Sequence, residues 1–423
     1  MGKDTLKCNM KNGLFVFLMV LLLTSSAVLS QAQETFIVGS FRCEIMDDSA
    51  SVRISAIGAD SSIILAEPRT EVRIPASVIH DGRTYHVKEI GRNAFGLNND
   101  VRKIVIDNGI EKIDRYAFAF CLSLESAYIP ASVTNIEENI FYGCDNLREI
   151  TVDKGNPRYD SRDNCNAIII TQPNTLIEGC YTTLIPKTVR FIGGDAFNGC
   201  NRLTKLVIPE GVTELGRGAV RNCPNLSRVY ISSTVDEIRD NVFHGCTSLK
   251  EILVDKKNEQ YDSRDNSNGV FCGDELVIAC SNTIIPKEVK RIVRNPFVSA
   301  SSMVEIPEGI EIIEENAFIG QKDIMIVLLP KSLKTIEDGA FENCSNLRLV
   351  GFNGSLEDFP QQIFCNCSSL EFINIPFGVK KIGKEAFKGC KNLKKIVIPS
   401  TVIEIDEDAF LGAPCEEEVG KLF

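Results

Sequence analysis

One segment of about 23 residues recurs along most of this chain, and it limits the possible folds more than any other feature. Its clearest copy is VKKIGKEAFKGCKNLKKIVIPST, at 379–401. Most copies follow at intervals of 23 residues, but two intervals are lengthened to 56 and 54 residues and one is shortened to 21. A fixed period in this range is the signature of a solenoid. The twelve copies, numbered here as coils one to twelve, begin at Val87, Ile110, Val133, Val189, Val212, Val235, Val289, Ile310, Leu333, Leu356, Val379 and Val402.

Phenylalanine and cysteine occupy fixed positions in the repeat. Eleven of the 23 phenylalanines align at one position, and only Val220 replaces phenylalanine there. Cysteine follows three residues later in eight copies. The aligned phenylalanines are Phe95, Phe118, Phe141, Phe197, Phe243, Phe297, Phe318, Phe341, Phe364, Phe387 and Phe410, and the cysteines are Cys121, Cys144, Cys200, Cys223, Cys246, Cys344, Cys367 and Cys390.

The spacing of apolar residues predicts the structure of one coil. Apolar residues nine and eleven after the aligned position, such as Ile396 and Ile398, indicate a short strand with one buried face. The Ala-Phe-x-x-Cys segment favours a single helical turn with both apolar residues inward. A single unit cannot bury its apolar face alone, so the units must stack. The sequence therefore predicts an α/β repeat solenoid: a curved rod with a parallel β-sheet face and short helical turns opposite.

Other segments divide the chain further. Residues 33–86 lack the repeat and contain strand-like runs, such as 36–38 and 63–65, which predict a β-rich N-terminal cap before the solenoid of residues 87–423. The lengthened intervals predict insertions at 156–188 and 258–288, each containing Tyr-Asp-Ser-Arg-Asp-Asn and an extra strand pair. Residues 411–423 are expected to form a C-terminal cap.

The repeated Tyr-Asp-Ser-Arg-Asp-Asn segments allow two interpretations. The paired aspartates, Asp160 with Asp163 and Asp262 with Asp265, provide oxygen atoms that a cation accepts as ligands. Alternatively, each segment is a turn that is stabilised by aspartate hydrogen bonds and an Arg–Asp pair. A full set of carboxylate ligands is missing from either loop, so no metal site is predicted.

Residues 1–32 have the features of a secretory signal peptide. Three lysines precede an apolar run at 14–23, and Ser30-Gln31-Ala32 fits a small-x-small cleavage site. The alternative is an uncleaved anchor, but the apolar run is shorter than the ~20 residues of a spanning helix. No later segment is apolar enough to span a membrane. We therefore expect an exported protein, secreted or at the cell surface, with the periplasm as a third location.

Composition and motifs exclude several classes of function. The formal net charge of −11 argues against a nucleic-acid partner. The three histidines are scattered, and nucleophile, phosphate-loop and dinucleotide motifs are absent, so no catalytic residue and no cofactor is predicted and the chain is expected not to be an enzyme. The eight aligned cysteines favour packed free thiols over disulfides, whereas pairing of the other cysteines stays open.

The repeat, written I-x-x-I-G-x-x-A-F-x-x-C-x-x-L-x-x-I-x-I-P, resembles the BspA-type (Treponema pallidum-type) leucine-rich repeat from Val87 to about Phe410. The insertions resemble those of repeat proteins from gut and oral Bacteroides-type bacteria. The resemblance implies an exported or surface-exposed protein, and some family members act as adhesins for host extracellular matrix or in coaggregation. The C-terminal sorting domain, lipobox or anchor of larger members is not evident in this sequence.

The register of the strand also predicts which residues face outward. If positions nine and eleven point inward, positions eight and ten lie on the exposed face of the sheet. In coils eight to ten, that face collects apolar side chains, which usually mark an interaction surface. A covering segment, a dimer contact or simple β-propensity would also explain them. The candidate binding residues are Tyr128, Tyr230, Ile326, Leu328, Leu349 and Phe372.

Together these features favour an exported, non-catalytic leucine-rich repeat protein that presents a binding surface to a protein or glycan, as an adhesin does. The host extracellular matrix is one possible source of that partner. A structural scaffold of the cell envelope without a soluble ligand is the alternative, and a polysaccharide hydrolase is a third. The sequence identifies neither the ligand nor the oligomeric state.

Overall fold

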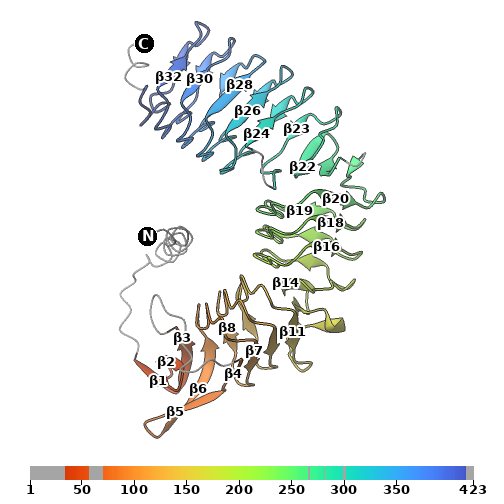
Figure 1. Ribbon diagram of the computed structural model, residues 1–423, viewed down its shortest axis with the longest axis vertical. Helices are drawn as coiled ribbons and strands as arrows, with labels where there is room; N and C mark the ends of the chain where they lie inside the picture. Colours follow the sequence, from red (N-terminus) through yellow and green to blue (C-terminus); the bar gives the residue numbers. More distant parts are fainter. Residues whose placement is uncertain (1–33, 57–69, 265–266, 281, 299–301, 416–423) are drawn as a thin grey trace, which may run out of the picture.

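The computed structural model describes residues 34–56, 70–264, 267–280, 282–298 and 302–415, which form a curved rod (Figure 1). The rod is a β-solenoid of about 14 turns, so the solenoid prediction is confirmed. The expected signal peptide at 1–32, the expected strand at 63–65 and the last part of the expected C-terminal cap, 416–423, lie outside the described residues.

One strand of three or four residues from each full coil builds the parallel sheet face. Adjacent strands pair in register, as in Ile326 beside Leu349. Their side chains alternate between exposed and buried, which is the period of two that the sequence showed. The four sheets contain β4 (Glu71–Ile74), β7 (Lys103–Ile106), β9 (Ser126–Ile129) and β11 (Glu149–Val152); β16 (Lys205–Ile208), β18 (Arg228–Ile231) and β20 (Glu251–Val254); β24 (Met303–Glu305), β26 (Ile326–Leu329) and β28 (Leu349–Phe352); and β30 (Phe372–Asn374) with β32 (Lys395–Val397).

A second row of two-residue strands runs along another side of the rod, and the sequence analysis did not anticipate it. These strands come from the I-x-x-I part of the repeat, where the last residue of each pair points into the core, as Ile113 does. They pair in parallel with the same strand of the next coil. The row includes β8 (Lys112–Ile113), β10 (Asn135–Ile136), β15 (Phe191–Ile192), β17 (Glu214–Leu215), β19 (Glu237–Ile238), β23 (Arg291–Ile292), β25 (Ile312–Ile313), β27 (Thr335–Ile336), β29 (Asp358–Phe359), β31 (Lys381–Ile382) and β33 (Glu404–Ile405).

The predicted short helical turns are wrong. The described residues contain no α-helix, and the Ala-Phe-x-x-Cys segments are chains of turns. Residues two before and two after the aligned position have positive φ, as in Asn139 (60°) and Gly143 (71°), whereas an α-helix requires φ near −63°. The backbone instead bonds to the next coil, where the Phe118 N–H donates to Ile140 O at 3.0 Å.

The missed signal was a glycine or asparagine two residues after the aligned position. These residue types tolerate positive φ. Nine coils have glycine or asparagine at this position, and φ is positive in each of them: Gly143, Gly199, Asn222, Gly245, Gly320, Asn343, Asn366, Gly389 and Gly412.

The N-terminal segment is built from antiparallel strands that merge into the solenoid. Strands β1 (Thr35–Val38), β2 (Phe41–Ile45) and β3 (Ser51–Ser55) form a meander, and β3 then pairs in parallel with β6 (Arg83–Ile90). Strand β5 (Ser77–His80) forms a hairpin with β6. Strand β4 already pairs with β7 of coil one, so the long-strand row starts within the segment expected as a cap.

Each insertion forms an antiparallel strand pair, and the core is divided there. The first contains β12 (Tyr159–Asp160), the 3₁₀ turn η1 (Arg162–Asn164), β13 (Ala167–Ile170) and β14 (Thr175–Gly179), and the second contains β21 (Gly269–Cys272) and β22 (Glu275–Ala279). Consecutive residues of these strands point in opposite directions. The buried residues form three hydrophobic clusters: an N-terminal, a central and a C-terminal core. At the first insertion, Ile168 packs in the N-terminal core and Ile169 in the central core. At the second insertion, Val270 packs in the central core and Phe271 in the C-terminal core.

The rod consists of two similar blocks followed by a longer one. Residues 101–164 and 203–266 match at a spacing of 102 residues, which pairs Tyr128 with Tyr230 and both Tyr-Asp-Ser-Arg-Asp-Asn segments. We call coils one to three with the first insertion the first block, coils four to six with the second insertion the second block, and coils seven to twelve the third block. The first and second junctions are the insertions that end the first two blocks.

Candidate functional site

The candidate site is the outward face of the long strands in the third block. In β26, Val327 and Leu329 are buried in the core, whereas Ile326 and Leu328 are half-buried on the opposite face. Ladder pairing places Met303 beside Ile326 and Ile326 beside Leu349. Met303 and Leu349 are 49% and 40% exposed. We call Met303, Ile326, Leu328, Leu349 and Phe372 the apolar patch.

Two contacts shape the apolar patch. A Cβ atom on Gly351 would lie 2.8 Å from Leu328 Cδ2, so the Leu328 side chain lies across the bare backbone of the neighbouring strand. The Lys395 ammonium lies 5.8 Å from the centre of the Phe372 ring and closes the patch on the C-terminal side. The sequence did not identify Met303 as an outward residue, because coil seven is shortened and its strand lies closer to the aligned phenylalanine than in other coils. The pairing of Met303 with Ile326 in the structure places Met303 in the apolar patch.

Tyr128 and Tyr230 lie in the other two blocks and are not brought together with the apolar patch. Their hydroxyl groups donate to Asp153 and Asp255, which follow the next strand along the rod. The hydrogen bond to Asp255 raises the pKa of Tyr230 to about 12, and Asp153 raises the pKa of Tyr128 in the same way. Both tyrosines therefore brace the loop that leads into an insertion, and their hydroxyls are engaged within the chain.

The outward face of the second block differs in chemistry from the apolar patch. Its strands present Lys205, Arg228 and Glu251 where the third block presents Ile326, Leu349 and Phe372. The Arg228 guanidinium forms an ion pair with Glu251 of the next coil. At this first outward position, apolar side chains are therefore a property of the third block, whereas the second outward position is apolar in both blocks, as Val207 and Leu328 show.

The aligned cysteines form a ladder of thiols inside the rod. The described residues contain 15 free cysteines and no disulfide. Seven of the eight aligned thiols donate to the backbone oxygen at the aligned position of the preceding coil, as Cys367 does to Phe341 O at 3.1 Å. Burial raises the pKa of Cys344 and Cys390 to about 12. The thiols are thus protonated hydrogen-bond donors, a role that the prediction of packed free thiols did not include.

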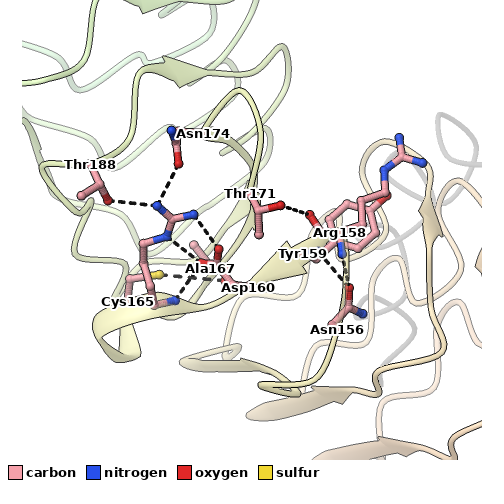
Figure 2. Close-up of polar contacts among 10 residues, drawn as sticks. Asn156, Arg158, Tyr159, Asp160, Cys165, Ala167, Thr171, Asn174 and Thr188 are labelled. Atoms are coloured by element: carbon pink, nitrogen blue, oxygen red, sulfur yellow. Dashed lines mark hydrogen bonds and ion pairs between the residues drawn. The ribbon is translucent and has the colours of Figure 1, made fainter.

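The first Tyr-Asp-Ser-Arg-Asp-Asn segment is arranged as the turn interpretation describes (Figure 2), whereas Asp265 and Asn266 of the second lie outside the described residues. The Asp160 carboxylate accepts from the backbone N–H and the guanidinium of Arg162, which also reaches Asn174 and Thr188. The second copy repeats the Asp262–Arg264 pair. Asn156 bridges two carbonyl groups of the coil before it, so the segment anchors the insertion to the rod.

Groups suited to catalysis or metal binding are scattered. Within the described ranges, no group of three or more histidine, cysteine, aspartate or glutamate side chains is arranged to hold a metal ion. Burial lowers the pKa of His244, and His80 stacks on the Phe36 ring at 4.2 Å. No helix in the described part of the chain is long and apolar enough to cross a membrane.

A comparison with protein-family models matches the BspA type leucine rich repeat region over residues 83–178, 179–303 and 290–415, with six copies. The chain belongs to this family. The matched segments cover most of the rod and divide it near the junctions that separate the three blocks. Leucine-rich repeat proteins of this family are found at the cell surface and are generally non-enzymatic.

Several solved structures are similar to this chain. A leucine rich cell surface protein from Faecalibacterium prausnitzii is 24% identical, covers 91% of this chain and 93% of its own, and has a TM-score of 0.41. Leucine-rich repeat proteins from Eubacterium ventriosum (17% identical, 91% and 96% covered, TM-score 0.43) and Bacteroides ovatus (22%, 89% and 92%, 0.36) are also similar. No curated protein matches the chain.

Proposed function

We propose that this chain is an exported, non-catalytic repeat protein that binds a protein or glycan partner through the apolar patch, in the manner of an adhesin. The surface location of family members supports export, which the signal-like residues 1–32 would direct. The absence of catalytic motifs from the sequence supports a binding role over a hydrolase.

One observation carries the proposal: the apolar patch extends across adjacent strands, at positions where the second block carries Lys205, Arg228 and Glu251. Burying a large apolar side chain against a partner contributes about 1.5–3 kcal/mol, so exposing several together favours association. At the equivalent positions of the second block, Arg228 and Glu251 form an ion pair within the chain and gain nothing comparable from a partner. Host extracellular-matrix proteins are the first partners to test, because matrix adhesion occurs in the family that the repeat resembles.

The double substitution Leu349→Asp with Phe372→Asp tests the site. Two charges on the apolar patch should reduce binding to immobilised matrix proteins or mucin at least about tenfold, since each charge must be desolvated at the interface. Val207→Asp is the matched control, because Val207 is 59% exposed on the outward face of the second block. The control variant should bind as the wild type does, and both should keep the wild-type melting temperature within a few degrees.

Two results would contradict the proposal. Equal binding by both variants and the wild type would exclude the apolar patch as the site. Retention of the wild-type protein by isolated cell-envelope fractions alone, without any binding to matrix or mucin, would favour the structural scaffold. Labelling of intact cells with a membrane-impermeant reagent tests export to the surface independently of either result.

A further inference from the structure

The two junctions interrupt the same backbone ladder. In ordinary coils, the N–H of the aligned phenylalanine donates to the following coil, as Phe118 does to Ile140 O at 3.0 Å. At the junctions, the carbonyl groups that would accept are used by the insertions: Ala196 O accepts from Gly179 N and Pro296 O accepts from Ala279 N, both at 2.8 Å. The N–H groups of Phe141 and Phe243, which point toward the next coil, therefore need other acceptors.

At the first junction, a buried carboxyl group takes this place. Glu178 of β14 is 7% exposed, and its carboxyl group faces the backbone N–H groups of Ile140 and Phe141. Around it, Asn139 donates to Asp195, and the Arg221 guanidinium binds Asp195 at 2.7 Å. The chain thus supplies its own carboxyl group to the interrupted ladder and fills the first junction with polar contacts.

At the second junction, this carboxyl group is missing. The strand pairing that sets Glu178 opposite Ile168 sets Ile278 opposite Val270, so an apolar side chain stands where the first junction has Glu178. Asn295 and Val298 replace Asp195 and Asn198, so the polar contacts of the first junction are not repeated. Like the Phe141 N–H, the Phe243 N–H has no backbone hydrogen-bond partner among the residues that the structure describes, and the apolar Ile278 stands at the position of Glu178.

A cleft of about 350 Å³ opens at this point, between coils six and seven. Asn241, Phe243, Ile278 and Pro296 line it, together with Arg294, whose side chain is 52% exposed. The carboxylate nearest to Arg294 is Asp240, and the two lie 3.9 Å apart, which is the outer limit of an ion pair. The cleft therefore combines an unpaired backbone donor, a loosely held guanidinium and an apolar wall.

We propose that the cleft at the second junction binds a carboxylate-bearing sugar residue, such as a uronic acid unit of a glycan. The ligand's carboxylate takes the position that Glu178 occupies at the first junction, between the Phe243 N–H and Arg294. Charge-assisted bonds of this kind are the strong ones. The proposal shares no residue with the apolar patch, so it stands or falls independently of that site.

The rim of the cleft distinguishes a sugar from an acidic peptide. The residues that line the cleft include two arginines, Arg239 and Arg294, and three carboxylates, Asp240, Glu275 and Glu314. These carboxylates accept hydrogen bonds from hydroxyl groups but repel further acidic side chains. A ligand with one carboxylate and several hydroxyls fits this arrangement. The volume, near the lower end of ligand pockets, accommodates a single sugar ring.

Saturation-transfer NMR on the full chain, with sodium glucuronate, glucose and N-acetylglutamate as probes, tests the proposal. Glucuronate should bind at least about tenfold more tightly than either of the others. Arg294→Gln should weaken glucuronate binding about tenfold, whereas Arg73→Gln, which removes an exposed arginine of β4, should leave it unchanged. Ile278→Glu should abolish binding, because it supplies the carboxylate from within the chain.

The outcomes separate the alternatives. Equal binding of glucose and glucuronate, no binding of glucuronate, or an unchanged Arg294→Gln variant would each overturn the site. Binding of N-acetylglutamate as tight as that of glucuronate would overturn the sugar assignment. Melting temperatures show whether Ile278→Glu is folded, and Arg294→Gln decides the question if it is not. The Leu349→Asp/Phe372→Asp variant should bind glucuronate normally, so failure of the apolar patch and failure of the cleft are distinguishable.

Discussion

The second and third blocks share their inward residues and differ in their outward ones. Both bury an aligned phenylalanine, a cysteine and alternate strand residues, as Val229 and Val327 illustrate. Outward, the second block sets Arg228 against Glu251 across adjacent coils, whereas the third sets Ile326 beside Leu349. In a solenoid, every second strand residue must be apolar because it packs in the core, whereas the residues between them face outward and can vary in chemistry. The chemistry of the face therefore varies without disturbing the rod.

The cores of the two blocks also differ in continuity. In the third block, the phenylalanine rings stack from coil to coil, with centroids 4.8 Å apart between Phe318 and Phe341 and 5.5 Å apart between Phe341 and Phe364. In the second block, Val220 interrupts the row, and Phe243 has no ring contact within the described residues. The third block is thus expected to be the more cooperative unit of the rod.

The largest expected effect is the loss of a ring from the continuous stack. Phe341→Ala should lower the free energy of unfolding by about 3–5 kcal/mol, because it leaves a cavity and removes two ring contacts. Phe243→Ala, the matched change in the second block, should cost about 1 kcal/mol less, since no ring contact is lost. Urea unfolding followed by circular dichroism measures both. Equal losses would show that stacking adds nothing to burial.

The second prediction concerns the pH dependence that the first junction introduces. Burial raises the pKa of Glu178 from 4.5 to about 8, so the folded chain binds this proton more tightly than the unfolded chain does. The stabilisation is complete below the unfolded pKa and is lost as the pH rises through the folded one. Between pH 6 and pH 8, the loss should be roughly 2–3 kcal/mol.

Glu178→Gln should remove that loss, because the amide does not ionise. The relevant measurement is the difference in unfolding free energy between wild type and variant across this pH range, which cancels the contributions of other titrating groups. The second junction has Ile278 at the equivalent position, so Ile278→Leu should leave the pH dependence of the wild type unchanged. A constant difference between wild type and Glu178→Gln would mean that the carboxyl is solvated.

The sequence predicted the solenoid, the parallel sheet and its register, because core positions such as Phe387 and Ile396 recur at a fixed period. It failed at the turns, where the choice depends on φ at Asn139 and Gly143 and the apolar spacing also fits a helix. It grouped Ile326, Leu328, Leu349 and Phe372 but could not find the cleft. The cleft depends on the Pro296 carbonyl group, which accepts a hydrogen bond from Ala279 of the insertion and not from Phe243. No local sequence pattern indicates this long-range contact.

The smallest expected effect tests whether the outward face stabilises the rod at all. The Arg228 and Glu251 side chains are 53% and 32% exposed, and an ion pair in this setting contributes about 0–1 kcal/mol. A double-mutant cycle with Arg228→Gln and Glu251→Gln should therefore give a coupling energy below about 1 kcal/mol that disappears in 1 M salt. The pair Ile326 and Leu349, changed to alanine in the same cycle, should show a coupling that salt does not weaken, because their contact is apolar. A large coupling energy that persists in salt for the charged pair would mean that these outward residues contribute to the stability of the rod. Substitutions on the outward face of the second block would then cost more stability than substitutions on that of the third.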